Sequence, residues 1–187
     1  MSAVARMRAA AVPDVETAVL DRARRGDHEA FAIVVRHYDP QLRALAYRLL
    51  GSRDRMDDAL QEAYVNAFRA LPRFRGQSQL GTWLHRIVFN VCLDELGRLR
   101  RAETVPLEDA PEPLAPGPDH ADLVAGRERL EQALARLGAH DRAAVLLVDG
   151  QGFDYAAAAE VLGIPPGTVA SRLNRAARRS VARSGNP

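Results

Sequence analysis

The 187-residue chain contains no lysine, a single cysteine and no long hydrophobic run. Because Cys92 is the only cysteine, an internal disulfide is excluded and a reducing, cytoplasmic compartment is predicted. No apolar run approaches the ~20 residues that cross a bilayer, so membrane insertion is not expected. Residues 1–13 lack the apolar core and cleavage site of a signal peptide and are expected to form a flexible tail.

The side chains that build catalytic centres are scattered along the sequence. The five histidines lie far apart, and no glycine-rich phosphate loop is present. Cys92 stands among apolar neighbours on a predicted helix, which favours an inert core position over a redox role. We therefore expect no enzyme, and neither a cofactor, a metal ion nor a small-molecule substrate.

The charges are unevenly distributed although the formal net charge is only +2. Residues 166–187 hold five arginines and no acid, whereas residues 102–126 hold six acids and no arginine. This asymmetry indicates a nucleic-acid-binding face and a separate acidic segment. Every basic residue is an arginine, and a GC-rich genome explains that bias by itself, so arginine content alone is weak evidence for nucleic-acid binding.

Helical periodicity dominates the sequence, and strand signals are poor. Five prolines between residues 104 and 118 remove the possibility of a helix there. We therefore predict an all-α chain of two small helical domains, residues 14–102 and 122–187, joined by an extended, proline- and acid-rich linker at 103–121. The predicted helices are 14–25, 27–50, 54–71, 80–101, 122–137, 139–150, 154–162 and 166–182.

The sharpest local pattern is a helix, a short glycine-containing turn and a second helix near the C-terminus. Asp154 can cap the first helix, Gly163 can end it, and Pro166 can occupy the first position of the next. This is the helix-turn-helix pattern, whose second helix reads duplex DNA. The alternative is an ordinary amphipathic helix with a solvated charged face. The candidate DNA-binding residues share one polar, basic face: Thr168, Ser171, Arg172, Arg175 and Arg179.

A second candidate surface lies on the predicted helix 80–101 and the polar loop 74–79 before it. An exposed indole beside an arginine and an asparagine suits unstacked bases, since it offers a stacking platform, a cation and an amide. The alternative is that Trp83 belongs to the core and Asn90 is simply solvated. The candidate residues for an extruded base are Phe74, Arg75, Gln77, Trp83, Arg86 and Asn90.

A cluster of polar side chains, Asp57, Asp58, Gln61 and Glu62, opens the predicted helix 54–71. Carboxylates in this position interact favourably with the helix dipole, and they could equally bind a basic helix of a partner. A metal site is not favoured, because no histidine has the spacing to join them.

Two blocks of the sequence resemble the extracytoplasmic-function (ECF) sigma factors, the minimal members of the bacterial sigma-70 family. Sigma domain 2 resembles MDDALQEAYVNAFRALPRFRGQSQLGTWLHRIVFNVCLDELGRLRR. Sigma domain 4 resembles LARLGAHDRAAVLLVDGQGFDYAAAAEVLGIPPGTVASRLNRAARR. The resemblance extends from about residue 16 to residue 183, and the segment TWLHRIVFNVCLDEL further resembles the actinobacterial sigma-M type.

The resemblance implies an alternative sigma factor that directs core RNA polymerase to promoters by minus-35 recognition and minus-10 melting. It assigns the 57–62 cluster to the polymerase β′ clamp helices and domain 4 to the β flap. It assigns the 74–79 loop and Asn90 to a flipped minus-10 base, and Thr168, Ser171, Arg172 and Arg175 to the minus-35 element. An anti-sigma protein is a further implied partner.

Two positions depart from the family pattern. Ala170 stands where the family usually has lysine, which removes one phosphate contact. The first helix of the pair also lacks the glutamate that would complete a capping box after Asp154. Both departures predict weak minus-35 binding. The alternative function is a helix-turn-helix regulator that binds duplex DNA without polymerase, usually as a dimer on a palindrome.

Overall fold

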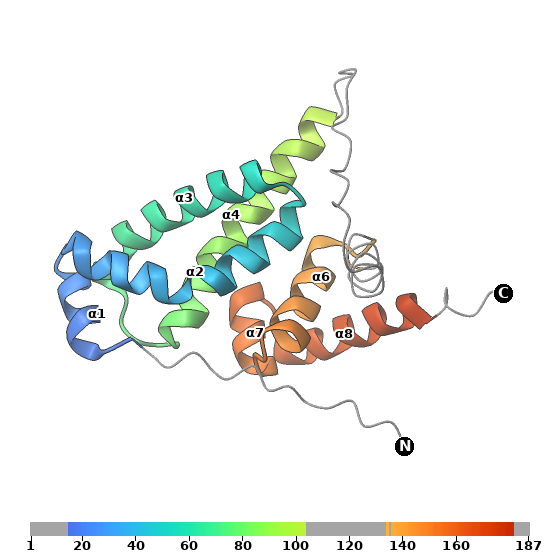
Figure 1. The fold of residues 1–187 in the computed structure, drawn as a ribbon. Coiled ribbons are helices and arrows are strands. Elements are labelled where there is room, and N and C mark those ends of the chain that lie inside the picture. Colours follow the sequence, from blue (N-terminus) through green and yellow to red (C-terminus); the bar gives the residue numbers. More distant parts are fainter. Residues whose placement is uncertain (1–14, 104–133, 135, 182–187) are drawn as a thin grey trace, which may run out of the picture.

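The computed structural model describes residues 15–103, 134 and 136–181 (Figure 1). Within these residues no strand occurs, and the predicted all-α fold is confirmed. The helices of the N-terminal half are α1 (Thr17–Arg24), α2 (His28–Leu50), α3 (Arg53–Ala70), the 3₁₀ turn η1 (Leu71–Arg73) and α4 (Leu80–Glu103). Those of the C-terminal half are α6 (Ala139–Val145), the π-helical turn η2 (Leu146–Gly150), α7 (Tyr155–Leu162) and α8 (Pro166–Val181).

Some predictions fall outside the described residues. The tail at 1–13, most of the helix at 122–137 and the linker at 103–121, apart from its first residue, lie there. That first residue, Glu103, is the last residue of α4. The domain boundaries therefore remain predictions.

Helix ends lie where the sequence supplies capping side chains and glycines. The Asp27 carboxylate accepts a hydrogen bond from the Ala30 amide at 3.0 Å, and Gly51 ends α2 in the left-handed region with φ of +69°. In the C-terminal half Asp154 caps α7 in the same way, and Gly163 ends it with φ of +65°. These are the two interactions that satisfy the unpaired backbone groups of a helix end.

The N-terminal half is built on α2, α3 and α4, with α1 packed across one end of α2. Leucines and valines at helical spacing point inward and are almost fully buried. Gly81, in the first turn of α4, allows close approach to α2, since a Cβ there would lie 2.9 Å from Tyr38 Cε1. The largest fully buried aliphatic side chains of this half are Val34, Leu42, Leu45, Leu49, Leu60, Leu71, Leu84 and Val88.

The C-terminal half consists of α6, η2 and the α7–α8 pair. Ala143, Leu147 and Val169 are each fully buried where these elements meet. The chain reverses between α7 and α8 at Gly163 and Pro165, as the helix-turn-helix pattern predicts.

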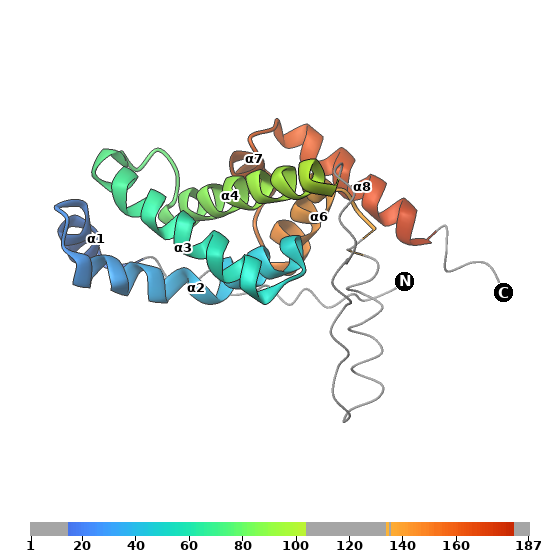
Figure 2. The same ribbon diagram turned by 90° about the horizontal axis from the view of Figure 1, so that it is seen from above.

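The two halves lie in direct contact, although the sequence pattern suggests two bodies separated by a tether. Both views place α7 beside α4, and the end of α2 meets α6 (Figures 1 and 2). The reason is that α4 is apolar on two sides. Leu84 and Val88 belong to the N-terminal core, while His85 and Phe89, both buried, contact aromatic side chains of the C-terminal half.

Candidate nucleic-acid interface

The predicted base-capture surface lies on α4 and the loop before it. Arg86 and Asn90 are exposed on α4, and Arg75 and Gln77 are exposed in the loop. Trp83 is half-buried, so it is neither sealed in the core nor fully free. Its indole packs partly against the hydrophobic core and is partly exposed.

Phe74 is the exception within this set, because it is 9% exposed and packs on the indole. The ring centroids of Phe74 and Trp83 lie 5.0 Å apart with a tilt of 40°. Phe74 thus supports Trp83 from inside instead of meeting a base itself. At the other end of the loop the Trp83 amide donates to the Gln79 carbonyl at 3.0 Å, which joins the loop to the first turn of α4.

The polar cluster on α3 borders a groove between α2 and α3. Asp58, Gln61 and Glu62 are exposed, whereas the Asp57 carboxylate pairs with Arg43 from α2. The groove has a volume of about 620 Å³, and its apolar walls include Phe68. Its remaining lining residues include His28, Phe31, Leu60, Tyr64 and Val65.

A hydrogen-bonded network holds the shape of this groove. The Tyr64 hydroxyl donates to Asp39 at 2.7 Å, and Arg43 bonds the other oxygen of Asp39 at 3.2 Å. Burial, together with the Asp39 carboxylate, raises the pKa of Tyr64 above its ordinary value, so the phenol stays protonated. Sequence alone does not reveal the groove, because helical spacing does not show that Phe31 of α2 and Phe68 of α3 meet, with ring centroids 5.1 Å apart.

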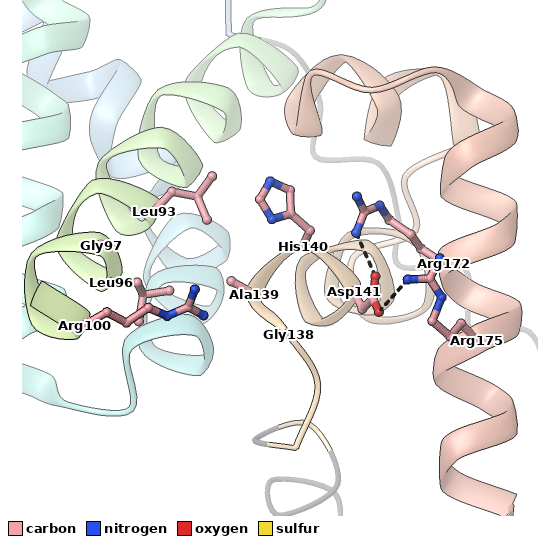
Figure 3. Close-up of a pocket in the computed structure, with 10 residues that line it drawn as sticks. All are labelled: Leu93, Leu96, Gly97, Arg100, Gly138, Ala139, His140, Asp141, Arg172 and Arg175. Carbon is pink, nitrogen blue, oxygen red and sulfur yellow. Dashed lines mark hydrogen bonds and ion pairs between the residues drawn. The ribbon is translucent and has the colours of Figure 1, made fainter. Parts of the chain in front are cut away.

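The basic face of α8 divides into two parts. Ser171 and Arg175 are exposed and Thr168 is half-buried near the start of the helix. Arg172 instead turns toward α6, where its Nη1 lies 2.8 Å from Asp141 Oδ1 (Figure 3). The side chain of Arg179 lies outside the described residues.

Asp141 is the centre of the charge arrangement on this side. Its side chain is 8% exposed, and a second arginine, Arg175, approaches its other oxygen to 3.7 Å. The sequence analysis missed it, since the pairing with Arg172 spans 31 positions and nothing local marks it. Asp141 draws Arg172 away from the exposed basic face of α8 and holds α8 against α6.

Among the residues that the structure describes, no group of three histidine, cysteine or carboxylate side chains could hold a metal ion. Cys92 is fully buried, and burial raises the pKa of its thiol to about 12, so it remains protonated. None of the described helices is both long and apolar enough to span a bilayer.

Family models match both halves of this arrangement. Sigma-70 region 2 matches residues 34–102, which cover most of α2 and all of α3 and α4 except its last residue. Sigma-70 region 4 matches residues 127–179, which include α6, α7 and most of α8. The two matches thus identify a sigma-type transcription factor with regions 2 and 4 of the sigma-70 family.

Curated relatives narrow the family further. The ECF RNA polymerase sigma factor SigM of Mycobacterium tuberculosis is 41% identical over 154 residues, 82% of this chain and 76% of that protein. The ECF RNA polymerase sigma-E factor of Escherichia coli is 33% identical over 172 residues, 84% of this chain and 88% of that protein. The chain belongs to the ECF class of the sigma-70 family and is an alternative sigma factor.

Two solved structures share the fold. CnrH, in complex with the cytosolic domain of CnrY, superposes with a TM-score of 0.67 at 25% identity, covering 90% of this chain and 97% of CnrH. The sigma factor RpoE of Bartonella quintana, in complex with the anti-sigma factor NepR, gives a TM-score of 0.63 at 30% identity, covering 80% and 92%.

Proposed function

We propose that the chain binds core RNA polymerase and divides promoter recognition between its two halves. The α4 face and the loop at 74–79 capture an unpaired minus-10 base, and α8 reads the minus-35 duplex. The observation that carries this proposal is the pair of exposed side chains, Arg86 and Asn90, beside a half-buried Trp83. A protein that binds only duplex DNA has little use for such a surface.

The α4 surface suits single-stranded DNA for physical reasons. The indole of Trp83 can stack on a base, Arg86 can hold a backbone phosphate, and the Asn90 amide can both donate to and accept from a base edge. Trp83 is backed by Phe74, so the stacking surface is already in place before DNA arrives. That preorganisation lowers the entropy lost on binding.

In our proposal α8 meets the duplex through Thr168, Ser171 and Arg175, with Arg172 holding the helix in place from behind. The short polar side chains near the start of the helix suit base edges, and Arg175 suits a phosphate or a guanine. Pairing of Arg172 with Asp141 leaves fewer basic side chains for DNA, in keeping with the weak minus-35 binding that Ala170 predicts.

The α2–α3 groove and its acidic rim are the proposed contact with the β′ clamp helices of the polymerase. The groove is lined by apolar side chains together with Asp57 and Gln61, and Asp58 and Glu62 are exposed on the same helix. An amphipathic helix with basic side chains along its border fits such a surface. We propose that the second half contacts the β flap. The polymerase then supplies all the catalysis, and the factor works in the cytoplasm without an enzymatic activity of its own.

An anti-sigma protein is a further proposed partner. Both structural relatives are seen in complexes, CnrH with the cytosolic domain of CnrY and the sigma factor RpoE with the anti-sigma factor NepR. Because this chain shares their fold over most of its length, an anti-sigma protein of its own is a reasonable expectation. Co-purification of the tagged full chain from its native cells tests this.

Reversing the charge of Asp58 tests the polymerase contact. We expect Asp58→Arg to weaken binding to core polymerase about tenfold or more, because a like charge then faces the basic partner helix. The measurement is a titration of labelled full-length factor with core enzyme at two salt concentrations. Asp149→Arg, the same change at an exposed position of the other half, is the control. Equal affinities for the two variants would contradict the proposed site.

A further inference from the structure

The loop at 74–79 is held by a residue that lies outside both sigma-70 matches. Arg24, the last residue of α1, donates from Nη2 to the Phe74 carbonyl oxygen at 2.6 Å. The matched region 2 begins only at residue 34, so neither match includes α1. The bond joins two positions 50 residues apart and is partly buried.

Packing and hydrogen bonds hold the C-terminal end of α1, so the Arg24 side chain starts from a fixed backbone position. Ala23, next to it, is 1% exposed and packs into the core. Gly26 turns the chain with φ of +91°, and the Asp27 amide donates back to the Arg22 carbonyl at 3.2 Å. The Arg22 side chain also bonds the Asp27 carboxylate, which closes the turn between α1 and α2.

The Phe74 carbonyl is a sensitive point of the loop. Phe74 follows the three-residue helix η1, whose last carbonyls have few partners within so short a helix. A guanidinium donor gives a stronger bond to such a carbonyl than a neutral group does. Arg24 therefore fixes the backbone at the residue whose ring supports Trp83.

We propose that Arg24 is a positioning residue for capture of the unpaired minus-10 base. It acts through Phe74 and Trp83 and does not touch DNA itself. The proposal rests on the function proposed for this loop. Without the Arg24 bond the loop samples other conformations, so it captures the base more slowly and discriminates less between matched and mismatched bases.

The test uses full-length Arg24→Ala with core polymerase and promoters that carry the matched or a mismatched minus-10 base. We expect open-complex formation on the matched promoter to fall about tenfold. The ratio between matched and mismatched promoters should fall as well, while core affinity and Tm stay unchanged. Arg24→Lys, which keeps a cationic donor, should recover part of the discrimination. Arg25→Ala removes the same charge one position further on and should behave as the parent.

Two results would overturn the positioning role. One is that Arg24→Ala and Arg25→Ala give the same rates, and the other is that the rate falls with no change in discrimination. Asn90→Ala in the same assay separates the two levels of the proposal. If Asn90→Ala impairs opening and Arg24→Ala does not, only the role of Arg24 fails. If neither variant has an effect, the proposed base-capture surface fails too.

Discussion

Replacing Asn90 by alanine is expected to slow open-complex formation about 10- to 100-fold and to leave binding to core polymerase unchanged. Asn90 is exposed on α4, so its loss disturbs no packing. A side-chain amide that reads a base edge contributes about 1–3 kcal/mol of discrimination, which converts to this range of rates. The measurement is the rate of opening on a cognate promoter, followed with a fluorescent base in the minus-10 element.

The matched control for Asn90→Ala is Asn66→Ala, an exposed asparagine on α3. It removes the same amide from a surface to which we assign no DNA contact. Opening should proceed at the parental rate with this variant. A normal rate with Asn90→Ala would show that the amide does not read the base, whatever the α4 face binds.

Replacing Arg172 by alanine is expected to destabilise the C-terminal half by about 3 kcal/mol. The Asp141 side chain is only 8% exposed, and the substitution would leave it without its principal partner. Removing one member of a buried ion pair lowers stability by about 3–5 kcal/mol. We expect the lower end of that range, because Arg175 remains 3.7 Å from the other carboxylate oxygen. The measurement is the free energy of unfolding of the full-length factor, from urea denaturation.

A double-mutant cycle separates the structural role of Arg172 from base reading. Asp141→Asn removes the buried charge, so the further change Arg172→Ala should cost much less in that background. In transcription, the single Arg172→Ala variant should lose activity on promoters with intact and scrambled minus-35 elements alike. Unchanged stability with a loss confined to the intact minus-35 element would instead make Arg172 a base-reading residue, as the sequence pattern alone suggests.

The sequence predicts the helices well because their ends depend on local chemistry. The carboxylates of Asp27 and Asp154 cap helices by accepting a hydrogen bond from the amide three residues further along the chain. Gly51 and Gly163 end helices by adopting positive φ. These signals lie within a few residues of the feature they specify. The all-α class and the helix-turn-helix followed directly from them.

Contacts between distant segments were not predictable in the same way. The second apolar side of α4 looks like part of an ordinary helix face, yet its His85 contacts Phe153, just before α7, and its Phe89 contacts His140 of α6. Helical spacing places Arg172 on the basic face of α8, but it cannot show that Asp141 lies buried opposite. Arg24 acts through the backbone carbonyl of Phe74, and because every residue has such a carbonyl, no residue type marks this partner.

For the candidate site residues, the structure adds the exposure of each side chain to what the sequence predicts. Asn90, Arg86 and Asp58 are exposed and available, as their proposed roles need. Phe74 is buried behind Trp83, which makes it a support for the indole. The sequence predicts a neighbourhood for the site, and the tertiary packing decides which of its side chains are exposed.

The most direct test of the account is run-off transcription by core RNA polymerase with and without the purified full-length chain. We expect specific transcripts from cognate promoters only when both are present, with the chain acting as a monomer, and fewer of those transcripts when either promoter element is scrambled. Tight binding of the chain alone to a palindromic duplex, with no effect on transcription by core polymerase, would contradict it and favour a conventional helix-turn-helix regulator.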